Sequence, residues 1–141
     1  MQTEDNLAVL SRAECLALLP TVPIGRLVFT DRALPAVVPV NFVVHDGRIV
    51  VRTGQGSSLA AAVRGAVVAF EVDQVDEQAR NGWSVTVTGR ASEVVDPDAV
   101  AELSSLPLQP WAGGERNHFI VVPVDLVQGR RVGLGPLPTQ R

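Results

Sequence analysis

The chain has 141 residues, of which 46% are hydrophobic, so its length and composition fit a single domain with a substantial core. Charged residues make up only 19% and the formal net charge is −3, which leaves no positive field to attract a nucleic-acid backbone. Aromatic residues make up only 4%, which argues against a base-stacking surface, so we expect no nucleic-acid partner.

The compartment is indicated by the cysteine count and by the first residues. A single cysteine excludes an internal disulfide and is typical of a reducing compartment. The opening MQTEDNLAVL carries two acids and no basic residue before its short apolar patch, unlike a secretory signal. No apolar run approaches the roughly 20 residues that a membrane-spanning helix needs. We therefore expect a cytoplasmic protein without a membrane partner.

The first expected element is a helix over residues 11–19, SRAECLALL. Ser11 is followed three residues later by Glu14, which is a capping-box pattern: each side chain can bond the other's backbone N–H. Pro20 and Pro23 then end the helix, because proline cannot continue it.

Most of the remaining chain alternates or clusters apolar residues as strands do. Asp46-Gly47 joins two β-branched runs and predicts a two-residue type I′ hairpin turn. Asp96-Pro97 predicts an N-cap followed by proline in the first turn of a helix. We expect strands over 25–30, 36–45, 48–53, 66–75, 83–95 and 118–127, with short helices over 58–65 and 98–106.

This order of elements indicates a mainly β fold, an antiparallel barrel with short helices. The strands follow one another as hairpins, without the βαβ rhythm of a parallel sheet. We expect residues 1–141 to form one domain with loosely held termini, 1–10 and 133–141.

The hairpin turn at Asp46-Gly47 also fixes which side chains share a face. A two-residue loop places Asn41 opposite Arg52. Every second residue, from Val38 to Val44 on the first strand and from Ile49 to Thr53 on the second, then faces the core. The other face is mixed, because apolar residues interrupt its polar ones. Such a face suits cover by a second subunit, so we expect a homodimer. Its polar members are Asn41, His45, Arg48 and Arg52.

Residues 54–58, GQGSS, raise the main functional question. Arg52 supplies a fork of donors just before this segment, Ser57 and Ser58 add hydroxyls, and a helix start adds unpaired N–H groups, so the arrangement suits a phosphate. A solvated arginine and an ordinary helix cap explain the same residues. The residues alone leave both interpretations open.

Other chemistry-bearing residues are scattered. His45 and His118 lie far apart without clustered cysteines or acids, so we expect no metal site. Trp83 and Trp111 suit core packing as well as contact with a cofactor.

Several segments occur in an order and spacing that resemble one known family. They are GRLVF, PVNF, RTG followed by GSSL, VAFEVD, GWSVTVTGRA, PWAGGER and the closing GRR. From about Ser11 to Val132 the chain resembles the pyridoxamine 5'-phosphate oxidase-like family of split-barrel flavoproteins. The most similar branch includes the nitroimidazole-resistance-type reductases.

The resemblance implies a homodimeric split β-barrel with a flavin, FMN, in each of two clefts between the subunits. It implies an oxidoreductase that transfers two electrons to or from a small organic substrate, and it indicates no catalytic residue. The implied contacts are Val40 and Asn41 to the flavin, Arg52, Thr53, Ser57 and Ser58 to its phosphate, Trp83 and Ser84 alongside, Trp111 near the ring or substrate, and Arg130 nearby.

One position departs from the family pattern. Relatives carry a lysine where this chain has Ser58, and losing one charge-assisted hydrogen bond weakens phosphate binding by about 10- to 100-fold. Arg52 or Arg64 is the expected compensating cation. Two alternatives stay open. One is a reductase that uses a deazaflavin coenzyme, whose acidic tail would need Arg48 and these same arginines. The other is a non-catalytic dimeric module that binds a ligand such as haem.

Overall fold

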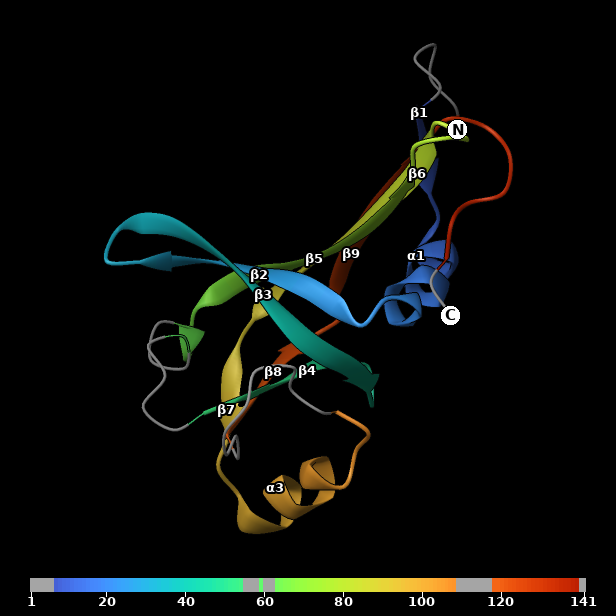
Figure 1. Ribbon diagram of the computed structural model, residues 1–141. Helices are drawn as coiled ribbons and strands as arrows, with labels where there is room; N and C mark the ends of the chain where they lie inside the picture. The colour runs from blue at the N-terminus through green and yellow to red at the C-terminus, as the bar shows by residue number, and fades with distance from the viewer. Residues whose placement is uncertain (1–6, 55–58, 60–62, 109–117, 140–141) are drawn as a thin grey trace.

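The computed structural model describes residues 7–54, 59, 63–108 and 118–139 (Figure 1). Strands dominate the described residues, as expected. The strands are β1 (Leu7–Leu10), β2 (Ile24–Asp31), β3 (Leu34–His45), β4 (Arg48–Thr53), β5 (Val67–Asp76), β6 (Asn81–Arg90), β7 (Ser92–Val94), β8 (His118–Pro123) and β9 (Leu126–Val132). The described helices are α1 (Arg12–Leu18), the 3-10 turn η1 (Leu19–Thr21) and α3 (Pro97–Ser104), and none is long and apolar enough to cross a membrane.

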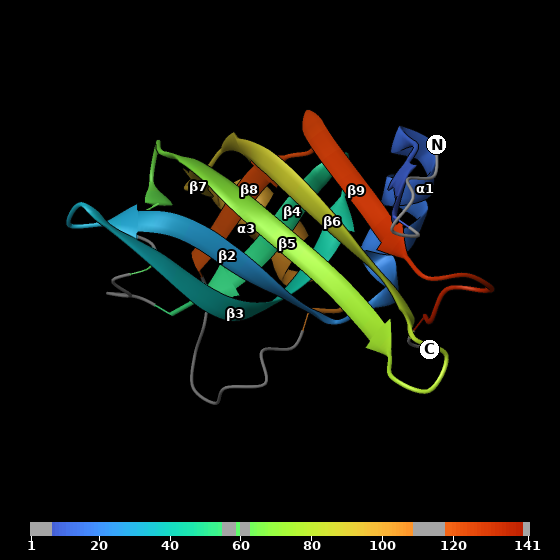
Figure 2. The same ribbon diagram turned by 90° about the horizontal axis from the view of Figure 1, so that it is seen from above.

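The strands pair antiparallel in the order β1-β9-β6-β5-β2-β3-β4-β8-β7. The sheet curls at β3, whose first part pairs with β2 and whose last four residues pair with β4. This gives a first layer of β1, β9, β6, β5, β2 and the start of β3, and a second layer of β4, β8, β7 and the end of β3. Figure 2 shows the second layer crossing behind the first. The split antiparallel barrel expected from the sequence is confirmed.

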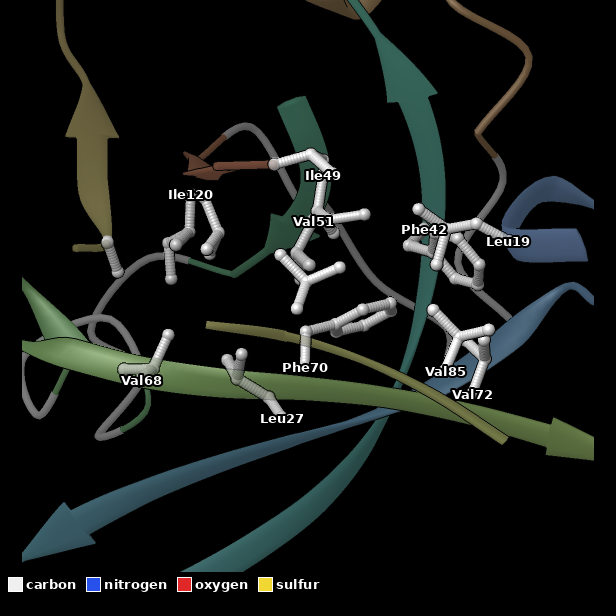
Figure 3. Close-up of a cluster of buried hydrophobic side chains, with 14 of the residues drawn as sticks. Leu19, Leu27, Phe42, Ile49, Val51, Val68, Phe70, Val72, Val85 and Ile120 are labelled. Carbon is white, nitrogen blue, oxygen red and sulfur yellow. The ribbon is translucent and has the colours of Figure 1, made fainter. Parts of the chain in front are cut away.

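The main core lies between the two layers (Figure 3). Leu27 and Phe70 project from the first layer and Val51 from the second, and all three are at most 1% exposed. The Phe70 ring meets Phe42 edge to face, with ring centroids 4.7 Å apart. It occupies the space above Gly25, where a Cβ would overlap the ring. The absence of a side chain at position 25 therefore lets the Phe70 ring fit.

A second, smaller core lies between the second layer and α3. It consists of Val50, Leu103, Leu108, Phe119 and Val121. The helix begins where expected, because the Asp96 side chain accepts a hydrogen bond from the N–H of Ala99 at 3.0 Å. The mixed face of β3 and β4 is therefore covered in part by the chain's own helix.

The local predictions for the first hairpin and the first helix are confirmed. Asp46 and Gly47 have φ values of 52° and 69°, as a type I′ turn requires, and His45 pairs with Arg48. In α1 the Ser11 hydroxyl accepts from the N–H of Glu14 at 3.1 Å, and the Glu14 carboxylate accepts from the N–H of Ser11 at 2.7 Å.

Two strands expected to be continuous are broken. The expected strand 83–95 divides at Ala91, which is fully buried and exchanges backbone hydrogen bonds with Gly65 and Ala66, so β6 stays in the first layer while β7 joins the second. The expected strand 118–127 divides at Val124 and Asp125, whose carbonyls accept hydrogen bonds from the Arg12 side chain. Both breaks depend on contacts with residues distant in the sequence.

The expectation of loose termini is wrong for most of the residues concerned. Leu7–Leu10 form β1 and pair with β9. Residues 133–139 are tied to β6, because the Asn81 amide donates to the carbonyls of Leu134 and Pro136 at 3.0 and 2.9 Å. The indole N–H of Trp83 donates to the carbonyl of Pro138 at 2.6 Å. Residues 1–6, 140 and 141 lie outside the described part of the chain.

On the outer face of the first layer, burial and then the neighbouring Asp73 raise the pKa of Glu71 to about 7, although Arg26 opposes the shift. The folded state therefore holds a proton that the unfolded state releases between pH 4.5 and 7, so stability falls as the pH rises through this range. We expect Glu71→Gln to be about 1 kcal/mol more stable than the wild type at pH 8, with no gain at pH 4.5.

Urea unfolding at both pH values measures this difference. Glu77→Gln in the exposed turn after β5 controls for the loss of one negative charge. An equal gain from both variants, or a gain at pH 4.5, would contradict the assignment to Glu71.

Candidate functional site

Arg52 is held near the end of β4 by contacts with two other segments. Its guanidinium carbon lies 5.3 Å from the centroid of the Phe119 ring, and its Nη1 donates to the carbonyl of Leu108 at 3.3 Å. The cation–π contact and the hydrogen bond fix the direction of the fork of donors. The arginine predicted to bind a phosphate is thus partly buried and oriented, unlike a freely solvated strand arginine.

Thr53 closes β4 on the opposite face, toward the barrel interior. Its side chain is 3% exposed, and its hydroxyl has no hydrogen-bond partner among the described residues. A buried hydroxyl without a partner costs about 1–3 kcal/mol, so such groups in native proteins call for a partner. Because residues 54–58 follow directly, this orphaned hydroxyl fits an oxygen of a ligand held at the strand end.

An apolar groove of about 530 Å³ lies beside this strand end. Two of its walls belong to segments that neighbour Arg52, although Arg52 itself does not line it. Phe42 and Val43 on its wall pair with Val51 and Val50, one and two residues before Arg52, and Leu106 and Pro107 lead to Leu108. Its size and apolar walls suit a flat aromatic ring. The full lining is Pro20, Thr21, Val22, Pro23, Phe42, Val43, Val44, Leu106 and Pro107.

The remaining predicted residues are spread over the first layer. Asn41 is half-buried, whereas Val40 packs against the main core. Ser84 lies opposite Arg130 in the β6–β9 register. Because β5 and β2 stand between β6 and β3, Ser84 is about 14 Å from Asn41 across three strand spacings. One chain therefore does not bring Ser84 and Arg130 together with Asn41 and Arg52.

Trp83 faces the core. It is 2% exposed, and its only polar hydrogen is donated to Pro138. The structure thus gives Trp83 a packing role, and of the two interpretations drawn from the sequence this placement favours the core. Ser57, Ser58 and Trp111 lie outside the described residues.

A polar cluster that the sequence analysis missed lies near the end of β4. Glu93 on β7 accepts from Arg64 Nη2 at one carboxylate oxygen and contacts His118 Nδ1 at the other, both at 2.8 Å. The Glu93 side chain is only 10% exposed, and the hydrogen bond with His118 is the main cause that lowers its pKa. Arg64, expected to compensate for Ser58, is thus engaged by Glu93. The available sequence signal was a glutamate at a core-facing position of β7.

A second cluster joins the first hairpin to α3. His45 Nε2 lies 2.9 Å from a carboxylate oxygen of Glu102 and 3.4 Å from one of Asp46, and the three ligand atoms lie within 4.8 Å of one another. The sequence separates His45 from Glu102, so this grouping was not expected. Both acids are largely exposed, and the contacts attach α3 to the turn.

Comparison with known proteins identifies the family to which the chain belongs. The family model for pyridoxamine 5'-phosphate oxidase matches residues 11–131, and the chain belongs to this family. The uncharacterized protein Rv0080 of Mycobacterium tuberculosis is 42% identical over 136 residues, covering 93% of this chain and 89% of that protein. The FAD-binding protein of Mycobacterium smegmatis has a similar structure, with a TM-score of 0.75 and 35% identity over 89% of this chain and 98% of its own.

A more distant structure bears on the branch suggested by the sequence. A Bacteroides thetaiotaomicron protein assigned to 5-nitroimidazole antibiotic resistance has a TM-score of 0.69 and 15% identity over 89% of this chain and 88% of its own. At this identity the likeness shows the fold alone. Together the comparisons confirm the resemblance to the pyridoxamine 5'-phosphate oxidase family and its split-barrel fold.

Proposed function

We propose that the chain is a flavin-dependent oxidoreductase that transfers two electrons between a nicotinamide donor and a small organic substrate. The observation that carries this proposal is the end of β4, where an oriented Arg52 and an orphaned Thr53 hydroxyl directly precede GQGSS. When bound, the flavin supplies the redox chemistry. The residues of this chain bind its phosphate, orient its ring and keep water from it.

Each part of the site has a distinct role in this proposal. Arg52 donates to the phosphate, and Thr53 shares its buried hydroxyl with a phosphate oxygen. Ser57 and Ser58 follow in the same segment. Asn41 and the apolar groove beside Val43 would hold the ring.

The same site suits either FMN or FAD. The resemblance implies FMN, whose phosphate monoester carries close to two negative charges near neutral pH. FAD is favoured by the similarity to the M. smegmatis FAD-binding protein. Fluorescence titrations with FMN, FAD and a deazaflavin coenzyme distinguish these cofactors and test the deazaflavin alternative.

The proposal includes a homodimer. The outer face of the first layer supports it, because large apolar side chains are exposed there: Val37 by 59%, Val75 by 71% and Leu126 by 68%. A second copy would also bring its own Ser84 and Arg130 to the site. We expect light scattering to give about twice the 15.0 kDa chain mass. A monomer at micromolar concentration would contradict the two-subunit site.

Anaerobic reduction tests the catalytic part of the proposal. The flavin-loaded protein is mixed with NADH or NADPH without oxygen, and the visible absorption of the oxidised flavin is followed. We expect bleaching at a rate that saturates with nicotinamide concentration. If NADH and NADPH each reduce the bound flavin no faster than they reduce free flavin, the result would support a non-catalytic binding module instead.

A further inference from the structure

The cluster of Arg64, Glu93 and His118 faces the same side of the second layer as Thr53. Thr53 and His118 are directly opposite in the β4–β8 register, and opposite residues of an antiparallel pair share a face. Glu93 lies opposite Ile120, two residues along β8 from His118, and therefore projects to this face as well. The imidazole thus stands beside the orphaned Thr53 hydroxyl, at the strand end that leads into GQGSS.

Glu93 fixes the orientation of the imidazole. One oxygen of its carboxylate lies 2.8 Å from His118 Nδ1, and the other oxygen accepts a hydrogen bond from Arg64. Nε2 is the remaining polar atom of the ring and has no partner among the described residues. The His118 side chain is 34% exposed, so a ligand can reach it. A buried carboxylate that orients a histidine by one nitrogen, and leaves the other to meet a ligand, is a common functional arrangement.

We propose that His118, oriented by Glu93, is a further binding residue for the anionic phosphate end of the flavin. This inference rests on the proposed function and assigns the site a cation that Ser58 does not provide. With His118 protonated, the cluster carries one net positive charge and Nε2 donates to a phosphate oxygen. With His118 neutral and Nδ1 donating to Glu93, the cluster has no net charge and Nε2 presents a lone pair that repels the phosphate.

Flavin binding should therefore be tighter where the imidazole is protonated than where it is neutral. Among the described residues, Glu93 on β7 is the charged group in contact with His118, and Arg64 is the charged group in contact with Glu93. Thr53 on β4 adds a hydroxyl without charge. Arg52 points to the other face, against Phe119.

The test is a titration of FAD at pH 6 and pH 8. FAD is used because its diester keeps the same charge over this range, whereas the phosphate of FMN gains charge near pH 6. We expect the wild type to bind about 10-fold more tightly at pH 6, where one charge-assisted hydrogen bond is present. His118→Gln should bind about equally at both pH values, at the weaker level. Riboflavin, which lacks a phosphate, should bind without this dependence.

The other histidine supplies a matched control. His45→Gln removes an imidazole at the β3–β4 turn and should keep the wild-type ratio between pH 6 and pH 8. Glu93→Gln should weaken FAD binding at pH 6, because the carboxylate that orients the imidazole through Nδ1 is gone. It also gives an independent test if His118→Gln does not fold, which circular dichroism would show.

The outcomes separate this inference from the function on which it rests. If the wild type binds neither FAD nor FMN at any pH, the proposed function fails. If it binds FAD but His118→Gln keeps the wild-type pH ratio, or Glu93→Gln binds FAD as tightly as the wild type at pH 6, the inference is overturned and the cluster is structural.

Discussion

Replacing Arg52 by alanine should lower the affinity for FMN and FAD by about 10- to 100-fold, which is the loss of one or more charge-assisted hydrogen bonds to a phosphate. The fold should persist, because the side chain is only partly buried and its contacts among the described residues include a cation–π contact with Phe119 and a hydrogen bond to Leu108. We expect a loss of about 1 kcal/mol in the free energy of unfolding. Fluorescence titration and urea unfolding measure the two effects.

Arg48→Ala is the matched control, since Arg48 starts the same strand on the same face but pairs with His45 at the far end. It should leave flavin affinity within a factor of two or so of the wild type. Riboflavin affinity should be the same in both variants, because riboflavin has no phosphate. Equal losses for Arg52→Ala and Arg48→Ala would mean that charge on this face acts only at long range.

Replacing Phe70 by alanine should have the largest effect on stability. The ring is fully buried between the layers and packs edge to face on Phe42. Removing a buried phenylalanine typically costs about 3–5 kcal/mol, because contacts are lost and a cavity remains. Urea unfolding measures this loss. Val67→Ala on the same strand is the control: Val67 is 59% exposed, so we expect a change within about 0.5 kcal/mol.

The close packing of Phe70 on Gly25 can be tested by substituting both residues, singly and together. Alone, Gly25→Ala should cost about 1–3 kcal/mol, because its Cβ overlaps the Phe70 ring. In the Phe70→Ala protein the new methyl group has room, so most of that cost should disappear. Additive effects in this double-mutant cycle would show that the glycine is needed for another reason.

The sequence was sufficient wherever structure depends on neighbouring residues. The turn at Asp46-Gly47 defines the hairpin register, the Ser11–Glu14 capping box starts α1, and alternation places Val51 in the core. Each of these features needs information from only a few adjacent positions. The order of hairpins also indicated an antiparallel barrel, and the family resemblance added that this barrel is of the split type.

The errors arose where distant segments decide the structure. The strand 83–95 breaks because Ala91 exchanges hydrogen bonds with Gly65 and Ala66, and the C-terminal tail is ordered by Asn81 and Trp83. Neither contact leaves a local pattern.

The candidate site shows the same division. Arg52 and Thr53 could be predicted, because they precede a glycine- and serine-rich segment and match a family motif. His118 could not, because its meeting with Glu93 depends on β8 lying between β4 and β7. Trp83 was chosen from the resemblance; the parity of β6 turns it inward beside its outward neighbour Ser84, and its contact with the flavin stays a prediction.

The most direct test of flavin binding is a titration of FMN and FAD into the purified protein, following flavin fluorescence and the visible spectrum. The structure and the family predict saturable quenching by at least one of them, with one flavin bound per chain and a dissociation constant in the micromolar range or below. A folded protein that binds neither flavin would contradict the account, and the deazaflavin coenzyme and haem would then be tested in the same way.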